Sequence, residues 1–578
     1  MIRTLAQRIR EYKKATILTP LFMVGEVLME CAIPAIMALM IDHMSSTTVE
    51  PVIKYGLILV VLASVSLICG ANSARYAALA STGFAKNMRK DLFYKVQEFS
   101  FADIDKFSSS SLVTRLTSDV SHIQMAFGML IRMAVRAPLM LIFSAIMAFR
   151  ISKDMALIFV SIIPVLAIGL ISIFSVAHPI FRRIFKKYDA LNNSVQENVA
   201  GIRVVKSFVR EDYEIKKFNA ASEDVRKNFV KAERIVALNS PVMSTCMFVA
   251  MLLVSYNGAR IIISSGATEL TTGELSSLIS YGIQALSSLM MLSMVFMNII
   301  FSAEAANRIS EVLNHKSSLT SPENGLTEVR DGSIRFENAT FKYDPHGQRN
   351  ALSNIDLDIK SGQTIGIIGG TGSSKTTLIQ LISRLYDVTE GAVYVGGNDV
   401  REYDLKALRD AVAVVLQKNV LFSGSIKDNL RWGNKDATDE ELVRACKLAQ
   451  ADEFIQQLPD KYDTMLSQGG TNVSGGQKQR LCIARALLKK PKVLILDDST
   501  SAVDTKTDAL IRKAFASEIP DTTKIIIAQR IASVQDSDQI IVLEGGKIAE
   551  HGNHEELMAH NGIYREIYDS QTKGKEEN

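Results

Sequence analysis

Six segments in the first half of the chain are long and apolar enough to cross a lipid bilayer. A membrane-spanning helix needs about 20 mostly apolar residues, and the segments lie at 16–41, 52–78, 125–149, 155–178, 236–264 and 275–302. One such run alone could be a buried core helix, but six in one chain favour a membrane domain. This part of the chain is therefore predicted to be all-α, with six transmembrane helices in a lipid bilayer.

Positive charge is distributed unevenly over the connections between these segments. The connections 42–51, 150–154 and 265–274 are short and hold almost no Lys or Arg, whereas 79–124 and 179–235 are long and basic. Cytoplasmic connections carry the excess of Lys and Arg, so both termini and both long connections are predicted to be cytoplasmic. The helical periodicity of the long connections predicts that the membrane helices continue well beyond the bilayer.

The rest of the sequence has the composition of a soluble α/β domain. At 578 residues two or more domains are expected, and we expect a transmembrane domain at 1–315, a linker at 316–330 and the α/β domain at 331–578. The net charge of +4 is too small for a chain of this size to indicate a nucleic-acid partner. The five cysteines show neither metal-site spacing nor a disulfide framework.

A phosphate-binding loop is predicted near the start of the α/β domain. The apolar strand Thr364–Ile368 leads into Gly369-Gly-Thr-Gly-Ser-Ser-Lys-Thr376, and 377–385 reads as a helix. Backbone N–H groups and the helix N-terminus would hold the phosphates, with Lys375 reaching the β- and γ-phosphates and the Thr376 hydroxyl binding Mg²⁺. The predicted ATP-binding residues here are Gly369, Gly370, Thr371, Gly372, Ser373, Ser374, Lys375, Thr376 and Thr377.

Three further motifs follow this loop in a fixed order. Gln417 comes next, then Val473-Ser-Gly-Gly-Gln477, and then the apolar run Val493-Leu-Ile-Leu-Asp-Asp498. In this order they resemble the nucleotide-binding domain of the ATP-binding cassette (ABC) family. Six spans ahead of one such domain resemble the exporter branch, whose half-transporters work in pairs. The resemblance covers about 1–572. It implies an all-α six-helix transmembrane domain fused to an α/β P-loop ABC-type ATPase domain, with ATP and Mg²⁺ as cofactors.

The resemblance also implies a role for each motif. Tyr343 would stack on adenine, although a strand aromatic can also simply pack in a core. Gln417 and Asp497 would contact Mg²⁺ together with the loop threonine. Asp498 and Gln529 occupy the catalytic positions, where the family has a water-polarising glutamate and a switch histidine. The signature residues, which would contact the ATP held by a partner subunit, are Ser474, Gly475, Gly476 and Gln477.

Three positions on this nucleotide surface depart from the family pattern. Ser374 stands where glycine usually precedes the lysine, and its Cβ would strain the turn if φ is positive. Asp498 is one methylene shorter than glutamate, which withdraws its carboxylate by about 1.5 Å. Gln529 can hydrogen-bond a phosphate but cannot become cationic near pH 7. Because the signature is intact, the chain resembles the degenerate-site subunit of a heterodimeric exporter; a homodimer with two slow sites is the alternative.

The exporter resemblance implies movement of hydrophobic or amphipathic compounds out of the cytoplasm by alternating access. The chain would then be a multi-pass protein of the cell (inner) membrane. A lipid flippase and an ATP-gated channel or regulator are the alternatives. Short transverse helices near 108–114 and 207–213 would dock on the nucleotide-binding domains.

Some residues of the spans are open to two interpretations. Charged side chains would either line a water-filled pathway, or pair between subunits or lie outside the hydrocarbon core; they include Glu26, Glu30, Arg132 and Arg136. Methionines on one face of the last span would either contact substrate or simply pack; they are Met290, Met294 and Met297.

Overall fold

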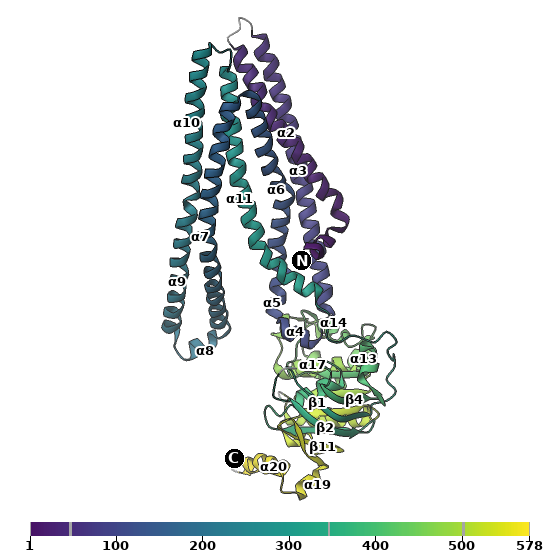
Figure 1. Cartoon of the computed structure of the whole chain (residues 1–578). Coiled ribbons are helices and arrows are strands. Elements are labelled where there is room, and N and C mark those ends of the chain that lie inside the picture. The colour runs from purple at the N-terminus through teal and green to yellow at the C-terminus, as the bar shows by residue number, and fades with distance from the viewer. Residues whose placement is uncertain (1, 45–48, 345–346, 500–502, 577–578) are drawn as a thin grey trace. The chain divides into compact units, whose positions relative to one another are not determined.

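The computed structural model describes residues 2–44, 49–344, 347–499 and 503–576 (Figure 1). The chain divides into two compact units. The helical unit is Met1–Gln97 with Ser110–His315, and the α/β unit is Glu98–Ser109 with Lys316–Asn578. The short segment 98–109 thus groups with the C-terminal part of the chain and not with its sequence neighbours.

Six long helices dominate the helical unit, and each overlaps one predicted span. They are α2 (Lys13–His43), α3 (Glu50–Gln97), α6 (Val120–Ile151), α7 (Lys153–Ala200), α10 (Asn239–Ser265) and α11 (Thr272–Asn314). Six helices among the described residues are long and apolar enough to cross a membrane, which confirms the six-helix transmembrane domain. α3 and α7 have 48 residues each. At 1.5 Å per residue that is about 72 Å, far more than a hydrocarbon core of about 30 Å.

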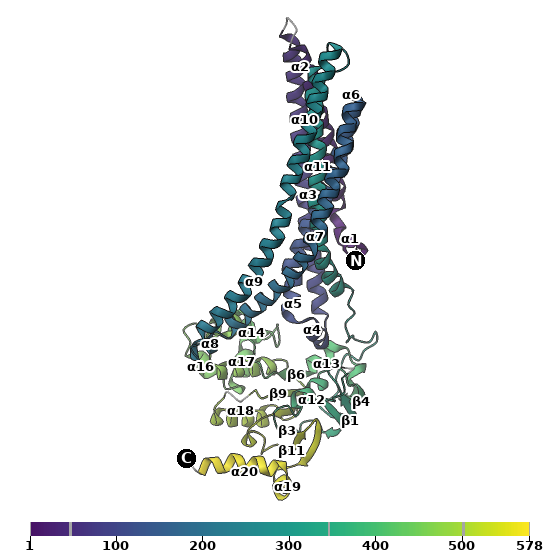
Figure 2. The same cartoon turned by 60° about the vertical axis from the view of Figure 1, so that its left-hand side comes forward.

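The other helices of this part of the chain lie at the N-terminus and in the long connections. They are α1 (Ile2–Ala6), the 3-10 helix η1 (Gln7–Tyr12), α4 (Phe101–Phe107), α5 (Ser109–Thr114), the π-helical turn η2 (Arg115–Asp119), α8 (Ile202–Ser207) and α9 (Glu211–Ala237). α7 and α9 run side by side, and α8 closes the hairpin between them (Figures 1 and 2).

Short helices lie in both long connections, one at its predicted position and one earlier. α5 (Ser109–Thr114) lies at the predicted 108–114 but continues through η2 into α6. The α/β unit holds a further short helix before it, α4, whose start is fixed by the capping box of Ser100 and Asp103. In place of 207–213, the α7–α9 hairpin holds α8. The chain leaves the helical region soon after α8, because Val209 has a φ of 52°.

Two sheets form the framework of the α/β unit. The antiparallel sheet has the order β2-β1-β4-β5, and the larger sheet has the order β12-β11-β3-β10-β9-β6. In the larger sheet only the β11–β12 pair is antiparallel. β7 and β8 form a separate small pair. The strands are β1 (Ile334–Phe341), β2 (Leu352–Ile359), β3 (Thr364–Gly369), β4 (Glu390–Val395), β5 (Asn398–Asp399), β6 (Val412–Val415), β7 (Gly424–Ser425), β8 (Met465–Leu466), β9 (Val493–Asp497), β10 (Thr523–Ile527), β11 (Gln539–Glu544) and β12 (Lys547–Gly552).

The larger sheet is buried on both faces, which explains the uninterrupted apolar run of β9. Val493 and Ile495 face one core and Leu494 and Leu496 face the other, as expected for a central parallel strand. The helices of this unit are α12 (Lys375–Ile382), α13 (Leu405–Ala411), α14 (Ile426–Arg431), α15 (Asp439–Leu448), α16 (Asp452–Gln456), α17 (Gly475–Leu487), α18 (Thr505–Glu518), α19 (His554–Ala559) and α20 (Ile563–Glu576), with short 3-10 turns at Val400–Glu402, Lys461–Asp463, Gln468–Gly470 and Ile531–Ser533. The predicted α/β fold of this part is confirmed.

Candidate functional site

The predicted nucleotide residues gather along one edge of the six-stranded sheet. The phosphate loop follows β3, Gln529 follows β10, Asp497 ends β9 and Gln417 follows β6. These four strands are neighbours in that order and run parallel, so their carboxyl ends meet at one edge. Ligands of open parallel sheets bind at this edge.

The phosphate loop passes directly into a helix. α12 begins at Lys375, earlier than the sequence pattern predicts, so its unpaired N–H groups open toward the loop, where they can bind an anion. Lys375 Nζ donates to the carbonyl oxygens of Gly369 at 2.9 Å and Gly370 at 2.8 Å. Burial lowers the pKa of Lys375, and the carboxylates of Asp497 and Asp498 oppose that shift.

Ser374 has the positive φ at which a Cβ is expected to strain the turn. It is the N-cap of α12, with φ 72° and ψ 25°. Glycine reaches this left-handed region freely, whereas the Cβ of another residue costs about 1–2 kcal/mol. The serine therefore stands at a position whose geometry favours glycine.

Thr376 and Asp497 lie side by side and fit a magnesium ion. Thr376 Oγ1 donates to Asp497 Oδ2 at 2.9 Å, so a hydroxyl and a carboxylate oxygen converge. Mg²⁺ prefers oxygen ligands and commonly takes one or two protein groups together with waters and substrate phosphates. Burial raises the pKa of Asp497, which is 2% exposed, and the Thr376 hydrogen bond opposes the shift. A divalent cation would favour its charged form.

The two predicted catalytic residues contact each other. Gln529 Nε2 donates to Asp498 Oδ2 at 2.9 Å, and Gln417 Nε2 approaches the same oxygen at 3.4 Å. Asp498 itself has a φ of 48°, and its N–H donates to the carbonyl of Ile527 at 3.0 Å. The carboxylate of Asp498 is thus placed between the residues that follow β6 and β10.

Tyr343 presents an accessible ring at the same part of the fold. The side chain is 54% exposed, and its hydroxyl lies 3.0 Å from Thr377 Oγ1 and donates to Gln380 Oε1 at 3.2 Å. Its ring packs edge-to-face on Phe341 and Tyr386 at centroid distances of 4.9 and 5.3 Å. The ring is therefore anchored on α12 and keeps a surface on which a base can stack.

The predicted signature residues start α17. Ser474 is its N-cap: the Ser474 hydroxyl accepts from the Gln477 N–H at 3.3 Å, and Gln477 Oε1 accepts from the Ser474 N–H at 2.8 Å. This capping box secures the start of α17. α17 lies toward α16 and α18 in Figure 2, whereas α12 lies toward β1 and β4.

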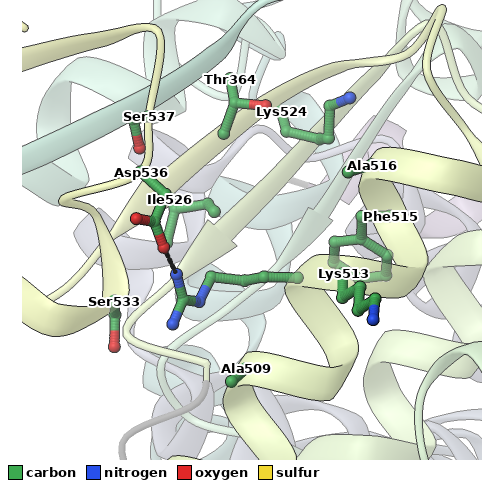
Figure 3. A pocket seen from close by; sticks show the side chains of 11 residues that line it. Thr364, Ala509, Lys513, Phe515, Ala516, Lys524, Ile526, Ser533, Asp536 and Ser537 are labelled. Atoms are coloured by element: carbon green, nitrogen blue, oxygen red, sulfur yellow. Dashed lines mark hydrogen bonds and ion pairs between the residues drawn. The ribbon is translucent and has the colours of Figure 1, made fainter.

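A separate cavity of about 250 Å³ opens between α18 and the six-stranded sheet (Figure 3). Thr364 begins β3 and Lys524 lies near the start of β10, so the cavity is at the amino-terminal half of these strands. Arg512 is one of the lining residues and donates to Asp536 at 2.8 Å. It is therefore distinct from the candidate nucleotide site at the carboxyl ends.

Three of the four charged residues singled out in the spans form an ion-pair cluster within one chain. Arg136 on α6 donates to Glu26 and, at 2.8 Å to both oxygens, to Glu30 on α2. Glu26 is 7% exposed, and a Cβ on Gly70 of α3 would lie 3.1 Å from its carboxylate. The cluster ties α2 to α6, an arrangement that neither sequence interpretation included. Arg132 lies one turn earlier on α6 and is half-buried.

The residues that surround α4 were not predicted from the sequence. Tyr386 OH donates to Asp105 at 2.6 Å, and Asp103 accepts from Ser317 and Ser318. The Ser100–Asp103 capping-box spacing is the signal that could have located α4. No comparable pattern marks Tyr386, because its partners are distant in sequence.

Comparison with known proteins identifies both parts of the chain. Residues 16–306 match the family model described as the ABC transporter transmembrane region, and residues 352–501 match the one described as ABC transporter. The uncharacterized ABC transporter ATP-binding protein YfiB of Bacillus subtilis is 36% identical over 552 residues, 95% of each chain. The ATP-dependent lipid A-core flippase of Desulfotalea psychrophila is 32% identical over 487 residues, 84% of each chain.

A solved structure shares the complete fold. It is that of a bacterial Atm1-family ABC exporter with ATP bound, and the two chains agree with a TM-score of 0.83 over 97% of this chain and 98% of that one, at 23% identity. The present chain belongs to the ABC transporter family. Within it, the chain is a fused half-transporter of the exporter type, a multi-pass membrane protein and an ATP-hydrolysing transport ATPase.

Proposed function

We propose that this chain is one subunit of a heterodimeric exporter and contributes one slow and one sound half-site for ATP. The observation that carries the proposal is the contrast between the Asp498–Gln529 pair and the complete signature at Ser474–Gln477. The former lies beside the chain's own phosphate loop. The latter would face the ATP held by the partner.

The proposed ATP site uses the residues at the carboxyl edge of the sheet. The α12 N-terminus and Lys375 bind the phosphates. Thr376, Asp497 and Gln417 hold Mg²⁺, which neutralises charge on the phosphates when bound. Tyr343 stacks on the base. The 2.9 Å separation of Thr376 Oγ1 and Asp497 Oδ2 supports this division of roles.

Slow turnover at this site follows from the chemistry of two side chains. Asp498 is shorter than the family's glutamate, and a misplacement of about 1 Å can cost a hundredfold in rate. Gln529 donates an amide proton to that carboxylate but cannot take up a proton as histidine can. The Asp498 carboxylate therefore lies back from the attacking water and is already engaged by its neighbour.

An apolar cavity in the helical unit supports a hydrophobic or amphipathic substrate. Its volume is about 400 Å³. α6, α7 and α11 line it with apolar side chains and a single serine, namely Ala134, Ala167, Leu170, Ile171, Phe174, Leu289, Leu292, Ser293, Val295, Phe296 and Ile299. Met290 and Met294 lie on α11, 45% and 61% exposed. Neither methionine is among the residues that line the cavity. The substrate would leave the cytoplasm across the cell (inner) membrane, with both termini on the cytoplasmic side.

Photolabelling can test the slow site directly. The transporter, purified with whatever half-transporter accompanies it, is cycled with azido-ATP labelled in either the α- or the γ-phosphate and then irradiated. When the base is stacked on Tyr343, irradiation attaches its azido group covalently to this chain. Equal retention of both labels after many turnovers of the complex supports the proposal. Retention of the α-label with loss of the γ-label would overturn it.

A homodimeric exporter or lipid flippase with two slow sites is the second candidate. Its support is the 32% identity to a chain named as a lipid A-core flippase. Purification of the chain without a second half-transporter, in an active dimer, would favour it. An ATP-gated channel would equilibrate a solute across vesicles and would not accumulate it against a gradient.

A further inference from the structure

α4 is fastened at its start to the chain that enters the α/β unit. Asp103, 3% exposed, accepts hydrogen bonds from the Ser317 hydroxyl at 2.9 Å and from the Ser318 N–H at 3.2 Å. The hydroxyls of Ser100 and Ser318 lie 2.6 Å apart. These bonds hold one end of α4 in place without involving any predicted nucleotide residue.

The middle of α4 meets one tyrosine from the segment after α12. Tyr386 OH donates to Asp105 Oδ2 at 2.6 Å, and the Tyr386 ring meets Phe101 edge-to-face at 6.2 Å. Tyr386 is only 8% exposed. Burial and the Asp105 carboxylate raise the pKa of Tyr386 well above its usual range, so its hydroxyl remains a donor at every physiological pH.

The same ring contacts the tyrosine of the base site. The Tyr386 and Tyr343 ring centroids lie 5.3 Å apart at an interplanar angle of 86°, and Phe341 packs against both rings. Edge-to-face aromatic pairs of this kind have a preferred geometry, so moving one ring affects the other. Tyr386 thus contacts Tyr343 on one side and α4 on the other.

We propose that Tyr386 is a positioning residue that couples occupation of the base site to the placement of α4. The inference rests on the proposed function in one respect, the stacking of adenine on Tyr343. A stacked base restricts the Tyr343 ring, the ring contact restricts Tyr386, and the hydroxyl passes this restraint to Asp105. Because α4 lies in the connection between α3 and α6, the restraint acts on the chain segment that joins two spans.

Tyr386→Phe tests the relay because it removes the hydroxyl and keeps the ring. Tyr403→Phe is the matched control: Tyr403 is fully buried in the same unit and donates to the Val395 carbonyl at 2.8 Å. Amide hydrogen exchange of 101–107 is measured by mass spectrometry on the full chain in lipid nanodiscs. ATP is added with EDTA, so that binding occurs without hydrolysis.

In the parent protein, ATP should slow exchange in 101–107. In Tyr386→Phe the factor by which ATP slows this exchange should be about tenfold smaller. This is the size expected when a hydrogen bond to a charged group is lost. ATP affinity should stay within about threefold, since the ring contact with Tyr343 is kept. Tyr403→Phe should keep the full slowing. Asp105→Ala should reproduce Tyr386→Phe, and the double variant should add nothing further, as expected for two partners in one interaction.

Two results would overturn the relay. One is full slowing in Tyr386→Phe, and the other is ATP binding to the parent without any slowing in 101–107. Neither would contradict slow turnover or export. Conversely, an unchanged ATP affinity in Tyr343→Ala would contradict base stacking, which is part of the proposed function. That conclusion would hold whatever hydrogen exchange shows for α4.

Discussion

The two half-sites of this chain differ in how their geometry is secured. The signature half is a local structure: Ser474 and Gln477 cap α17 through each other, three residues apart. The phosphate-loop half is assembled from residues that follow four different strands, and two of its members, Ser374 and Asp498, have left-handed backbones. A substitution in the phosphate-loop half therefore disturbs several neighbouring residues at once, whereas the geometry of the signature half is set by its own short sequence.

The largest effect is expected from the signature half. Ser474→Ala combined with Gln477→Ala should lower the steady-state ATPase rate of the assembled transporter by about 10²–10³-fold, the usual cost of losing groups that stabilise transition-state charge. Asp498→Asn should change the same rate far less, because its site already turns over slowly. The measurement is phosphate release, with equal assembly of all variants confirmed.

The capping box makes a control necessary, since losing it costs about 1 kcal/mol of stability. Ser474→Asp keeps a good N-cap but places a negative charge toward the partner's γ-phosphate. It should lose as much activity as the double variant while unfolding at the parent temperature. If Asp498→Asn silences the complex and the signature variants remain active, the assignment of the two half-sites is reversed.

A smaller effect should follow from repairing the other half. Asp498→Glu with Gln529→His should raise turnover at this chain's own site by about 10–10²-fold, as the carboxylate regains its reach. Loss of the γ-label from the photolabelled chain measures this. Asp498→Asn with Gln529→His is the matched control and should remain slow. No gain despite unchanged ATP binding would show that the reach of Asp498 does not limit the rate.

Base binding concerns only the phosphate-loop half, which contains Tyr343, and it is measured as ATP affinity. Tyr343→Ala should weaken ATP binding by about 1–3 kcal/mol, the worth of one base stacked on an aromatic ring. Tyr343→Phe keeps the ring and loses only the hydroxyl contacts with Thr377 and Gln380, so it should bind nearly as the parent does. Equilibrium binding of a fluorescent ATP analogue is the measurement. Equal affinities in all three proteins would mean that Tyr343 only packs.

The smallest effect concerns stability. Ser374→Gly should stabilise the chain by about 0.5–1 kcal/mol, the cost of a left-handed non-glycine residue less the entropy that glycine loses on folding. Ser374→Ala keeps the Cβ and should give no such gain. Thermal unfolding of the nucleotide-free protein tests this, and an alanine variant as stable as the glycine variant would contradict it.

The features that the sequence predicted correctly are those with a local or periodic signal. The six spans follow from hydropathy, and β9 follows from the apolar run Val493–Leu496. The roles of the nucleotide residues remain predictions, although Gln417, Asp498 and Gln529 do lie together.

Contacts between distant residues could not be predicted. Nothing near Glu26 indicates that Arg136 is its partner, because the pairing depends on how α2 and α6 pack. The short helices of the long connections were predicted incompletely for a different reason, since α4 was missed and α8 was placed too late in the chain. Helix periodicity is weak in such short elements, and the capping box that starts α4 and the positive φ of Val209 after α8 decide their positions.

The grouping of 98–109 with the C-terminal unit has a practical consequence. An ATPase fragment cut near residue 316 would leave Ser317 and Ser318 without their acceptor and would uncover the Tyr386 ring. Such a fragment would expose new apolar surface and tend to aggregate. A soluble version therefore calls for α4 supplied as a separate peptide or joined by a flexible tether to the new N-terminus.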